Sequence, residues 1–279
     1  MQKILIPTDL SANALRAIKY AVELFKHGRT EIFLLHAYAD EVYSQAEDPD
    51  TFEDCKAEIC RKTEASLEGL KEELWGFSPN PKHNIHCVAA FGMLVDAVND
   101  WVEKENIDLV IMGTKGQTAD RNITFGSNTL QVIKYVNCPV LAIPEECALS
   151  FPKNILFCTD FLLPYKRREM KLLSNISKRY GAQLHFLYVS DFDNLSLRQQ
   201  DNKAFLEAVF KENRTQFHQV GGNDITKAVN EFIPKTEVEM LVMVNTRHSY
   251  LENILYQSTI EKIGLKINIP FLVMQNLSR

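Results

Sequence analysis

The sequence predicts an α/β protein built from two similar open sheets. Short apolar runs alternate with longer segments of helical period, and the alternation starts again after residue 152. Because the apolar runs carry no polar face, the strands should be parallel and covered by helices on both sides. The length of 279 residues is that of two ordinary domains.

The first half contains five predicted strands, the first from Ile4 to Ile6. Ser11 can cap the helix that follows, whose apolar positions recur at three and four residues as far as Phe25, and Gly28 is expected to end it. The later elements are strands at 32–37, 85–90, 109–112 and 140–143, and helices that carry Ile59, Thr63, Leu67, Leu70 and Leu74, that span Leu94 to Val102, and that run from about Ser127 to Val136.

The second half echoes the first in sequence. Thr8-Asp9 returns as Thr159-Asp160, an offset of 151, whereas residues 97–101 return as 228–232, an offset of 131. The second copy has therefore lost 20 residues between its first strand and its third helix. This pattern predicts an internal duplication of one whole domain.

The duplication predicts a domain at residues 1–146, a linker at 147–150 and a second domain at 151–279. Each is expected to be a five-stranded, Rossmann-like parallel sheet. The two domains are expected to form an internal pseudo-dimer through strands 140–143 and 271–274, because two apolar edge strands would otherwise stay exposed. Two independent domains on a linker remain the alternative, and homodimerisation of the chain is left open.

Composition and charge exclude several classes of protein. No apolar stretch is long enough to span a membrane, and the segment after Met1 is too short for a signal peptide, so a cytoplasmic location is expected. Residues 1–148 hold 14 basic and 23 acidic residues, and the remainder holds 17 and 13, so the net charges are -9 and +4. Neither half is basic enough to predict nucleic acid as a partner.

The cysteines and histidines do not predict a metal or a disulfide. The six cysteines include no C-x-x-C pair, which favours reduced thiols. His83, His86 and Cys87 form the one candidate metal cluster, but no second ligand pair accompanies them at finger-like spacing. No metal site is expected.

Glycines follow the fourth strand at a distinctive spacing. Gly113 and Gly116 are followed by Gly126 and Ser127, which open a helix, in the pattern G-x2-G-x9-G-S. The first two are expected to turn the chain with positive φ close to a ligand, and the helix N-terminus offers free N–H groups to phosphate. Glycines after a strand are also plain turn formers, so the spacing alone leaves both interpretations open.

Five segments together resemble the universal stress protein family, and the duplication resembles its tandem two-domain members. These segments are Pro7-Thr8-Asp9-Leu10-Ser11, Leu34-Leu35-His36-Ala37, Met112-Gly113-Thr114-Lys115-Gly116, Gly126-Ser127-Asn128-Thr129 and Cys138-Pro139-Val140-Leu141. The resemblance implies that the first domain binds ATP, or AMP or ADP, with magnesium as a candidate companion ion.

The same resemblance implies roles for individual residues. Asp9 and the backbone of Ala37 would face the adenine and Gly113 the ribose. The phosphates would lie against Gly116, Gly126, Ser127 and Asn128, while Pro7, Thr8 and Met112 complete the set. Lys115 and Arg121 either add charge near the phosphates or are solvated loop cations.

The second copy departs from the glycine pattern. At the 131 offset, Val244, Arg247 and Gln257 replace the three glycines, and only Ser258 keeps its type. A crevice filled by side chains is therefore expected there, without ATP, and an anion held by Arg247 and His248 is the alternative. The loop at 245–256 is expected to be partly helical.

Three functional classes fit this reading. The favoured one is a stress-response protein that binds adenine nucleotide and acts through its conformation on a protein partner. The others are a nucleotide-dependent enzyme, at most a slow ATPase, and a duplicated interaction scaffold without nucleotide. No Walker lysine, no catalytic triad and no second carboxylate beside Asp9 can be placed, so no catalytic residue is predicted.

Overall fold

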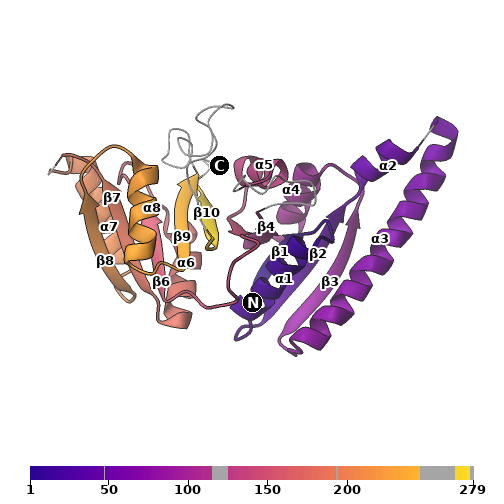
Figure 1. Cartoon of the computed structure of the whole chain (residues 1–279), viewed down its shortest axis with the longest axis horizontal. Helices are drawn as coiled ribbons and strands as arrows, with labels where there is room; N and C mark the ends of the chain where they lie inside the picture. Colours follow the sequence, from indigo (N-terminus) through magenta and orange to yellow (C-terminus); the bar gives the residue numbers. More distant parts are fainter. Residues whose placement is uncertain (47, 115–124, 193, 246–267, 277–279) are drawn as a thin grey trace. The chain divides into compact units, whose positions relative to one another are not determined.

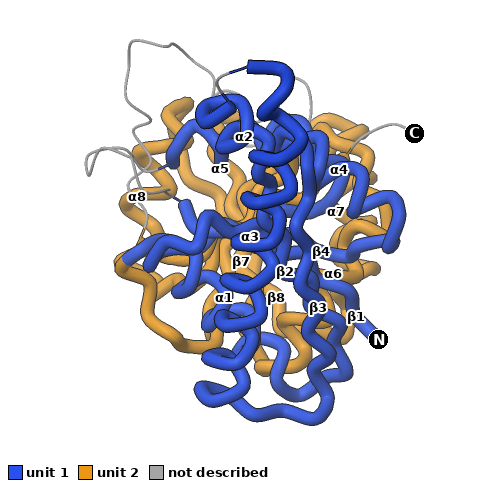
Figure 2. The backbone as a smooth tube through the Cα atoms, turned by 90° about the vertical axis from the view of Figure 1, so that its right-hand side faces the viewer, with its two compact units in different colours: residues 1–120, 125–145 blue, residues 121–124, 146–279 orange. Residues whose placement is uncertain are grey.

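The structure is a computed structural model that describes residues 1–46, 48–114, 125–192, 194–245 and 268–276. The described chain forms two compact units, the first up to Glu145 and the second from Glu146 (Figure 2). We call them unit 1 and unit 2 and describe each by itself.

Unit 1 alternates strands with helices, as the sequence predicts (Figure 1). Its elements are β1 (Gln2–Pro7), α1 (Ala12–Leu24), β2 (Thr30–Ala37), α2 (Ala39–Gln45), α3 (Pro49–Phe77), β3 (His83–Ala90), α4 (Leu94–Glu105), β4 (Leu109–Gly113), α5 (Ser127–Tyr135) and β5 (Val140–Ile143). The strand order is β3-β2-β1-β4-β5, and every neighbouring pair is parallel. The predicted parallel α/β sheet is confirmed.

The helices of unit 1 lie in two layers. Lys19 of α1 is paired with Glu73 of α3 at 2.9 Å, so these two helices share a face of the sheet. On α4, the Asn99 amide donates to the carbonyl of Tyr135 in α5 at 3.1 Å. Right-handed crossovers place the two pairs on opposite faces, because the winding direction reverses between β1 and β4.

Two helices of unit 1 differ from the sequence expectation. Helix α1 is capped by Ser11, whose Oγ accepts from the Ala14 amide at 3.2 Å, as predicted, but it ends at Leu24 and not at Gly28. The amide of Gly28 instead donates to the carbonyl of Phe25 in a separate turn. The short helix α2 was not predicted, since its seven residues span too few turns to show a period.

Unit 2 repeats this architecture with fewer residues. Its elements are β6 (Asn154–Cys158), α6 (Arg167–Tyr180), β7 (Gln183–Val189), α7 (Leu197–Val209), β8 (Arg214–Val220), α8 (Ile225–Lys235), β9 (Met240–Asn245) and β10 (Phe271–Gln275). The order is β10-β9-β6-β7-β8, again all parallel.

Strand register reproduces the offsets read from the sequence. Ile4 lies opposite Leu109 in unit 1, and Ile155 lies opposite Met240 in unit 2. Ile4 and Ile155 differ by the offset of 151, and Leu109 and Met240 differ by the offset of 131. The missing residues fall between the second and third strands of the unit. There, the 7 residues of α2 and the 29 of α3 give way to the 13 of α7.

Candidate functional site

The candidate site of unit 1 lies where its sheet changes winding direction. Helices after β1 and after β4 leave the sheet on opposite faces, which opens a crevice beyond the carboxyl ends of these two strands. Pro7 ends β1 and Gly113 ends β4, so the predicted residues around both lie at this edge. Ligands of open α/β sheets bind at such switch points.

The turn after β1 is held by its own side chains. The Thr8 amide donates to the carbonyl of Leu35 at 2.8 Å, and Thr8 Oγ1 accepts from the amide of Leu10 at 3.0 Å. Asp9 Oδ1 accepts from the amide of Ser11 at 3.0 Å. Leu10 adopts a left-handed φ of 60°. The carboxylate of Asp9 is thereby held at an exposed position at the mouth of the crevice.

His36 joins this turn to helix α2. Its Nδ1 donates to the carbonyl of Thr8 at 2.8 Å, and its Nε2 lies 2.9 Å from Glu41 Oε1. A carbonyl and a carboxylate both accept, so a ring nitrogen that bonds either of them donates its N–H. The ring is buried at the end of β2. Sequence reasoning missed this link, because His36 was read only as part of a strand end.

Hydrogen bonds join the two segments that flank residues 115–124, namely the end of β4 and the start of α5. Thr129 Oγ1 lies 3.0 Å from the carbonyl of Gly113 and 3.1 Å from that of Thr114, and the Gly126 amide donates to the carbonyl of Thr114 at 2.7 Å. Helix α5 begins directly after Gly126, and no described side chain caps it. Ser127 and Asn128 are exposed at this end, where the first N–H groups of a helix can receive an anion.

The reason for glycine at position 113 differs from the prediction. Gly113 is not among the described residues with positive φ. A Cβ placed there would lie 2.6 Å from Nδ2 and 2.9 Å from Cγ of Asn13 on α1. Close packing of α1 against the end of β4 therefore leaves no room for a Cβ unless the Asn13 side chain shifts. Gly116, Lys115 and Arg121 lie outside the described residues.

The other predicted residues occupy buried or half-buried positions. Thr8 and Met112 are buried, which makes them supports of the site, whereas Ala37 is half-buried at the end of β2. The backbone of Ala37 lies at the same edge as Pro7, since β1 and β2 pair in register up to Pro7 and Leu35. The structure thus brings the ends of β1, β2 and β4 and the start of α5 to one edge of the sheet.

Unit 2 carries the same turn beside a group of packed aromatic rings. Thr159 Oγ1 accepts from the amide of Phe161 at 2.9 Å, and Phe161 adopts a φ of 57°. The ring of Phe161 is buried against Tyr188 and Phe217, with centroids 5.5 and 6.3 Å apart. Asn202 of α7 donates to the carbonyl of Phe161 at 2.7 Å. Three aromatic rings thus pack together beside this turn.

The carboxylate that survives in unit 2 is partly enclosed. Burial raises the pKa of Asp160 above its usual range, although its Oδ1 accepts from the amide of Leu162 at 2.8 Å. The Gln199 amide donates to the backbone carbonyl of Asp160 at 2.9 Å and to the Tyr188 hydroxyl at 3.2 Å. Residues Arg247, His248, Gln257 and Ser258 lie outside the described ranges, and so does nearly all of the 245–256 loop that was expected to be partly helical.

The candidate metal residues are used otherwise. His83 Nε2 lies 3.3 Å from the carbonyl of Phe25, and His86 Nε2 lies 3.0 Å from the amide of Asn84. Burial raises the pKa of Cys87 to about 11, which disfavours the thiolate that binds metal. Within the described ranges, no three His, Cys, Asp or Glu side chains are grouped to hold an ion, and no helix is long and apolar enough to cross a membrane.

Comparison with known proteins gives relatives of the same kind for the first half and for the whole fold. Two proteins of Methanocaldococcus jannaschii, universal stress proteins MJ0531 and MJ0577, are each 28% identical to this chain. The matches cover 52% of this chain and 82% and 96% of the two relatives. A universal stress protein structure from Archaeoglobus fulgidus matches 98% of both chains with a TM-score of 0.66 and 18% identity, which shows the fold alone.

A sequence profile of the family matches more than half of the chain. The profile described as universal stress protein family covers residues 1–144, which is nearly all of unit 1 and includes every residue of the candidate site. Together with the α/β sheet of each unit, this match shows that the chain belongs to the universal stress protein family.

Proposed function

We propose that unit 1 binds an adenine nucleotide, ATP or its products ADP and AMP, at the carboxyl ends of β1 and β4. One observation carries the proposal: helix α5 starts after Gly126 without a side-chain cap from any described residue, at the edge where the Thr8-Asp9 turn also ends. Open N–H groups at a helix N-terminus attract phosphate. Gly113 and Gly126 of the glycine pattern lie at this edge, at the end of β4 and directly before α5.

The nucleotide is bound and not rapidly turned over in this proposal. Asp9 is the single carboxylate that we assign to the site, and its Oδ1 already accepts from the Ser11 amide. Phosphoryl transfer needs metal ions and charge held by several groups. Magnesium would therefore arrive with the phosphates and be held chiefly by them and by water, with the Asp9 carboxylate as the protein ligand.

The response to nucleotide would pass through the Thr8-Asp9 turn. His36 bonds both the Thr8 carbonyl and Glu41, so a shift of the turn is felt at helix α2. The stress-response role then consists of a change in the surface around α2 that a protein partner reads. Such a link needs only that nucleotide favours one arrangement of the turn over another.

Thermal unfolding with ligand tests the binding step. ATP with magnesium at a hundred times its dissociation constant should add about 2.7 kcal/mol of stability and raise the melting temperature. GTP at equal concentration is the matched control, since it carries the same phosphates on another base. No shift at millimolar ATP would sink the nucleotide proposal, and phosphate release faster than about one per second would favour an enzyme.

A scaffold without nucleotide is the second candidate, and unit 2 is the observation that favours it. Unit 2 keeps the sheet and the threonine turn while the side chain after that turn, Phe161, packs against other aromatic rings, so the same backbone turn can serve packing alone. Calorimetric titration separates the candidates. Heat that saturates at one site per chain supports the nucleotide protein, and flat titrations with ATP, ADP and AMP support the scaffold.

A further inference from the structure

Tyr43 of helix α2, Phe52 of helix α3 and Phe91 after β3 form a group of aromatic rings on unit 1, of which Tyr43 and Phe91 are exposed and Phe52 is half-buried. Tyr43 of α2 lies 5.6 Å from Phe52 of α3 and 6.1 Å from Phe91, measured between ring centroids, and Phe52 lies 6.1 Å from Phe91. Tyr43 is 64% exposed and Phe91 38%. We call these three residues the aromatic patch.

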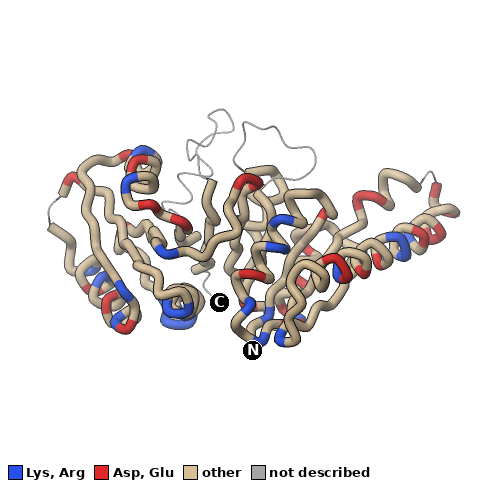
Figure 3. The backbone as a smooth tube through the Cα atoms, turned by 60° about the horizontal axis from the view of Figure 1, so that its bottom comes forward, with Lys and Arg blue, Asp and Glu red and all other residues tan. Residues whose placement is uncertain are grey.

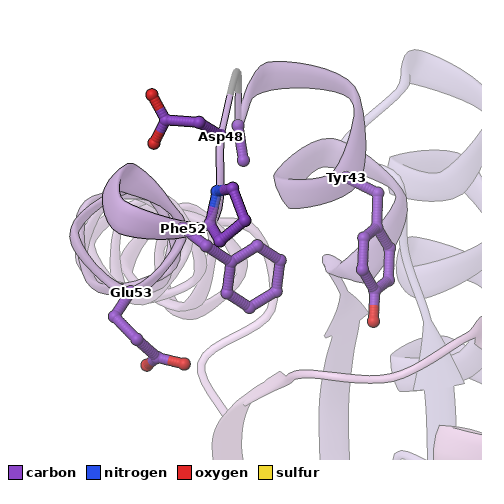
Figure 4. Close-up of a pocket in the computed structure, with 6 residues that line it drawn as sticks. Tyr43, Asp48, Phe52 and Glu53 are labelled. Carbon is purple, nitrogen blue, oxygen red and sulfur yellow. The ribbon is translucent and has the colours of Figure 1, made fainter.

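A small buried hydrophobic core supports the aromatic patch from below. Tyr38, Val42 and Ile59 form a small core between α2, α3 and the end of β2, and Phe52 packs on that core. The ring of Tyr38 also lies 5.7 Å from that of Phe91. Figure 4 shows Tyr43 and Phe52 on facing helices, lining a hollow that Asp48 and Glu53 border. The rings are therefore presented by a fixed support and are not loose surface side chains.

The surroundings of the aromatic patch are strongly acidic. No lysine or arginine occurs between Ala39 and Cys55. The acidic residues described in this stretch are all exposed: Asp40, Glu41, Asp48, Asp50, Glu53 and Asp54. Figure 3 shows acidic positions recurring along α2 and the first turns of α3. Hydrogen bonds from the Thr51 backbone and side chain lower the pKa of Asp48, so its carboxylate stays charged.

The chain itself shows how a cation fits this surface. The Nζ atom of Lys56 lies 4.4 Å from the ring centroid of Phe91 and 3.8 Å from Glu53 Oε2. The ammonium thus sits over an aromatic face beside a carboxylate, the arrangement in which cation–π attraction and charge pairing act together. The exposed ring of Tyr43 and the carboxylates around it offer the same chemistry to a cation from outside.

We propose that the aromatic patch and its acidic rim bind a basic segment of a partner protein, with a lysine or arginine side chain stacked on Tyr43 and Phe52. Charge complementarity selects this occupant, because exposed rings alone would accept any apolar segment, whereas the rim repels acidic ones. Arginine suits the surface best, since its flat guanidinium stacks on rings while its N–H groups reach carboxylates. The proposal names the partner chemistry for the surface around α2 to which the proposed function assigns a partner, and the peptide test below needs no nucleotide, so it can fail while nucleotide binding holds.

A labelled peptide of alternating arginine and leucine provides the probe. Its fluorescence anisotropy should rise and saturate on titration with the full chain, and binding should weaken steeply as salt is raised, because exposed charges are screened. A peptide with glutamate in place of arginine should not bind. Equal binding of the acidic peptide, or binding that is insensitive to salt, would overturn the proposal.

Substitutions at Tyr43 separate ring chemistry from apolar contact. Tyr43→Phe keeps the aromatic face and should leave the dissociation constant within about twofold, whereas Tyr43→Leu keeps apolar area alone and should weaken binding about fivefold. Equal affinity of the Leu and Phe variants would overturn the stacking. Because Tyr43 is mostly exposed, all variants should fold, and circular dichroism checks this.

Charge and position are tested by two further variants. The double substitution Asp50→Lys with Asp54→Lys should weaken the affinity for the peptide by more than about tenfold, since the rim then repels the peptide. Phe192→Ala, at an aromatic residue of unit 2 that is 77% exposed, is the matched control and should bind as wild type. Loss of binding in the control would overturn the assignment. So would concentration-dependent self-association of the chain that Tyr43→Leu abolishes, since the occupant would then be a second copy.

Discussion

Leu10 and Phe161 occupy equivalent left-handed positions in the two units, yet one is exposed and the other buried. Their φ angles are 60° and 57°, and each amide donates to the hydroxyl of the threonine two residues earlier. Leu10 is 40% exposed, whereas Phe161 is 3% exposed. The backbone of the turn has therefore been kept in both copies, while in unit 2 its side chain has become part of the core.

Phe161→Ala is expected to destabilise unit 2 by about 3–4 kcal/mol, because it removes a buried ring and leaves a cavity between Tyr188 and Phe217. Leu10→Ala, the matched change in unit 1, should cost under about 1 kcal/mol at its exposed position. Urea unfolding followed by circular dichroism measures both. Equal costs for the two variants would contradict the packing described for unit 2.

Gly113→Ala is expected to destabilise unit 1 by about 1–3 kcal/mol, because the new Cβ would meet the Asn13 side chain at 2.6 Å. The chain's two tryptophans, Trp75 and Trp101, both lie in unit 1, so their fluorescence follows its unfolding. Gly69→Ala in α3 is the control. A Cβ there meets nothing within 4 Å, and alanine should add about 0.5–1 kcal/mol. A Gly113→Ala protein as stable as wild type would refute the close approach.

Ser127→Asp is expected to move stability and nucleotide binding in opposite directions. A carboxylate in the first turn of α5 should stabilise the helix by about 0.5 kcal/mol, since no described side chain caps this end. The same charge should repel the phosphates and weaken the affinity for ATP by about tenfold, which corresponds to about 1.4 kcal/mol of binding free energy. Ser127→Asn, uncharged and of similar shape, should change binding by less than about twofold. If Asp binds ATP as well as Asn does, the phosphates do not lie at this helix end.

The sequence predicted the strands well because each is a run of buried apolar residues between turn signals. The unit 1 strands at 109–113 and 140–143 lie within one residue of their predicted limits. Side-chain packing could not be predicted from the sequence in the same way. The glycine spacing marked Gly113, but only the structure shows that a Cβ at this position would contact Asn13, one hundred residues earlier in the chain. The His36 link was equally hidden, since strand periodicity says nothing of what a ring bonds at the strand end.

The paired histidines of unit 2 predict how its stability depends on pH. His185 Nε2 lies 3.3 Å from Asn154 Oδ1, which only accepts, so this nitrogen donates and His185 Nδ1 accepts from His218 Nε2 at 3.0 Å. Phe232 packs edge-on against both rings. Burial lowers the pKa of each histidine below 6.5, and the second ring also disfavours a proton on His185.

The direction in which stability changes with pH follows from proton uptake by the folded and unfolded chains. Well above pH 6.5 both histidines are neutral in the folded and in the unfolded chain, so neither state binds more protons there and the pair causes no pH dependence. As the pH falls from 6.5 through the lowered native pKa values, the unfolded chain binds protons that the folded chain refuses, so stability declines. Urea unfolding between pH 7.5 and pH 5 should show this loss, and His185→Gln with His218→Gln should flatten it.

Two comparisons isolate the histidine pair. Burial raises the pKa of Asp160 and Glu169, which gives unit 2 a pH dependence of opposite sign, but these groups are present in the variant as well and cancel in the difference. His27→Gln, at an exposed position in unit 1, is the control substitution outside the pair. If the stability of the double variant fell with pH as steeply as that of wild type, the prediction would be wrong. Protonation of either ring would then cost no free energy in the folded state.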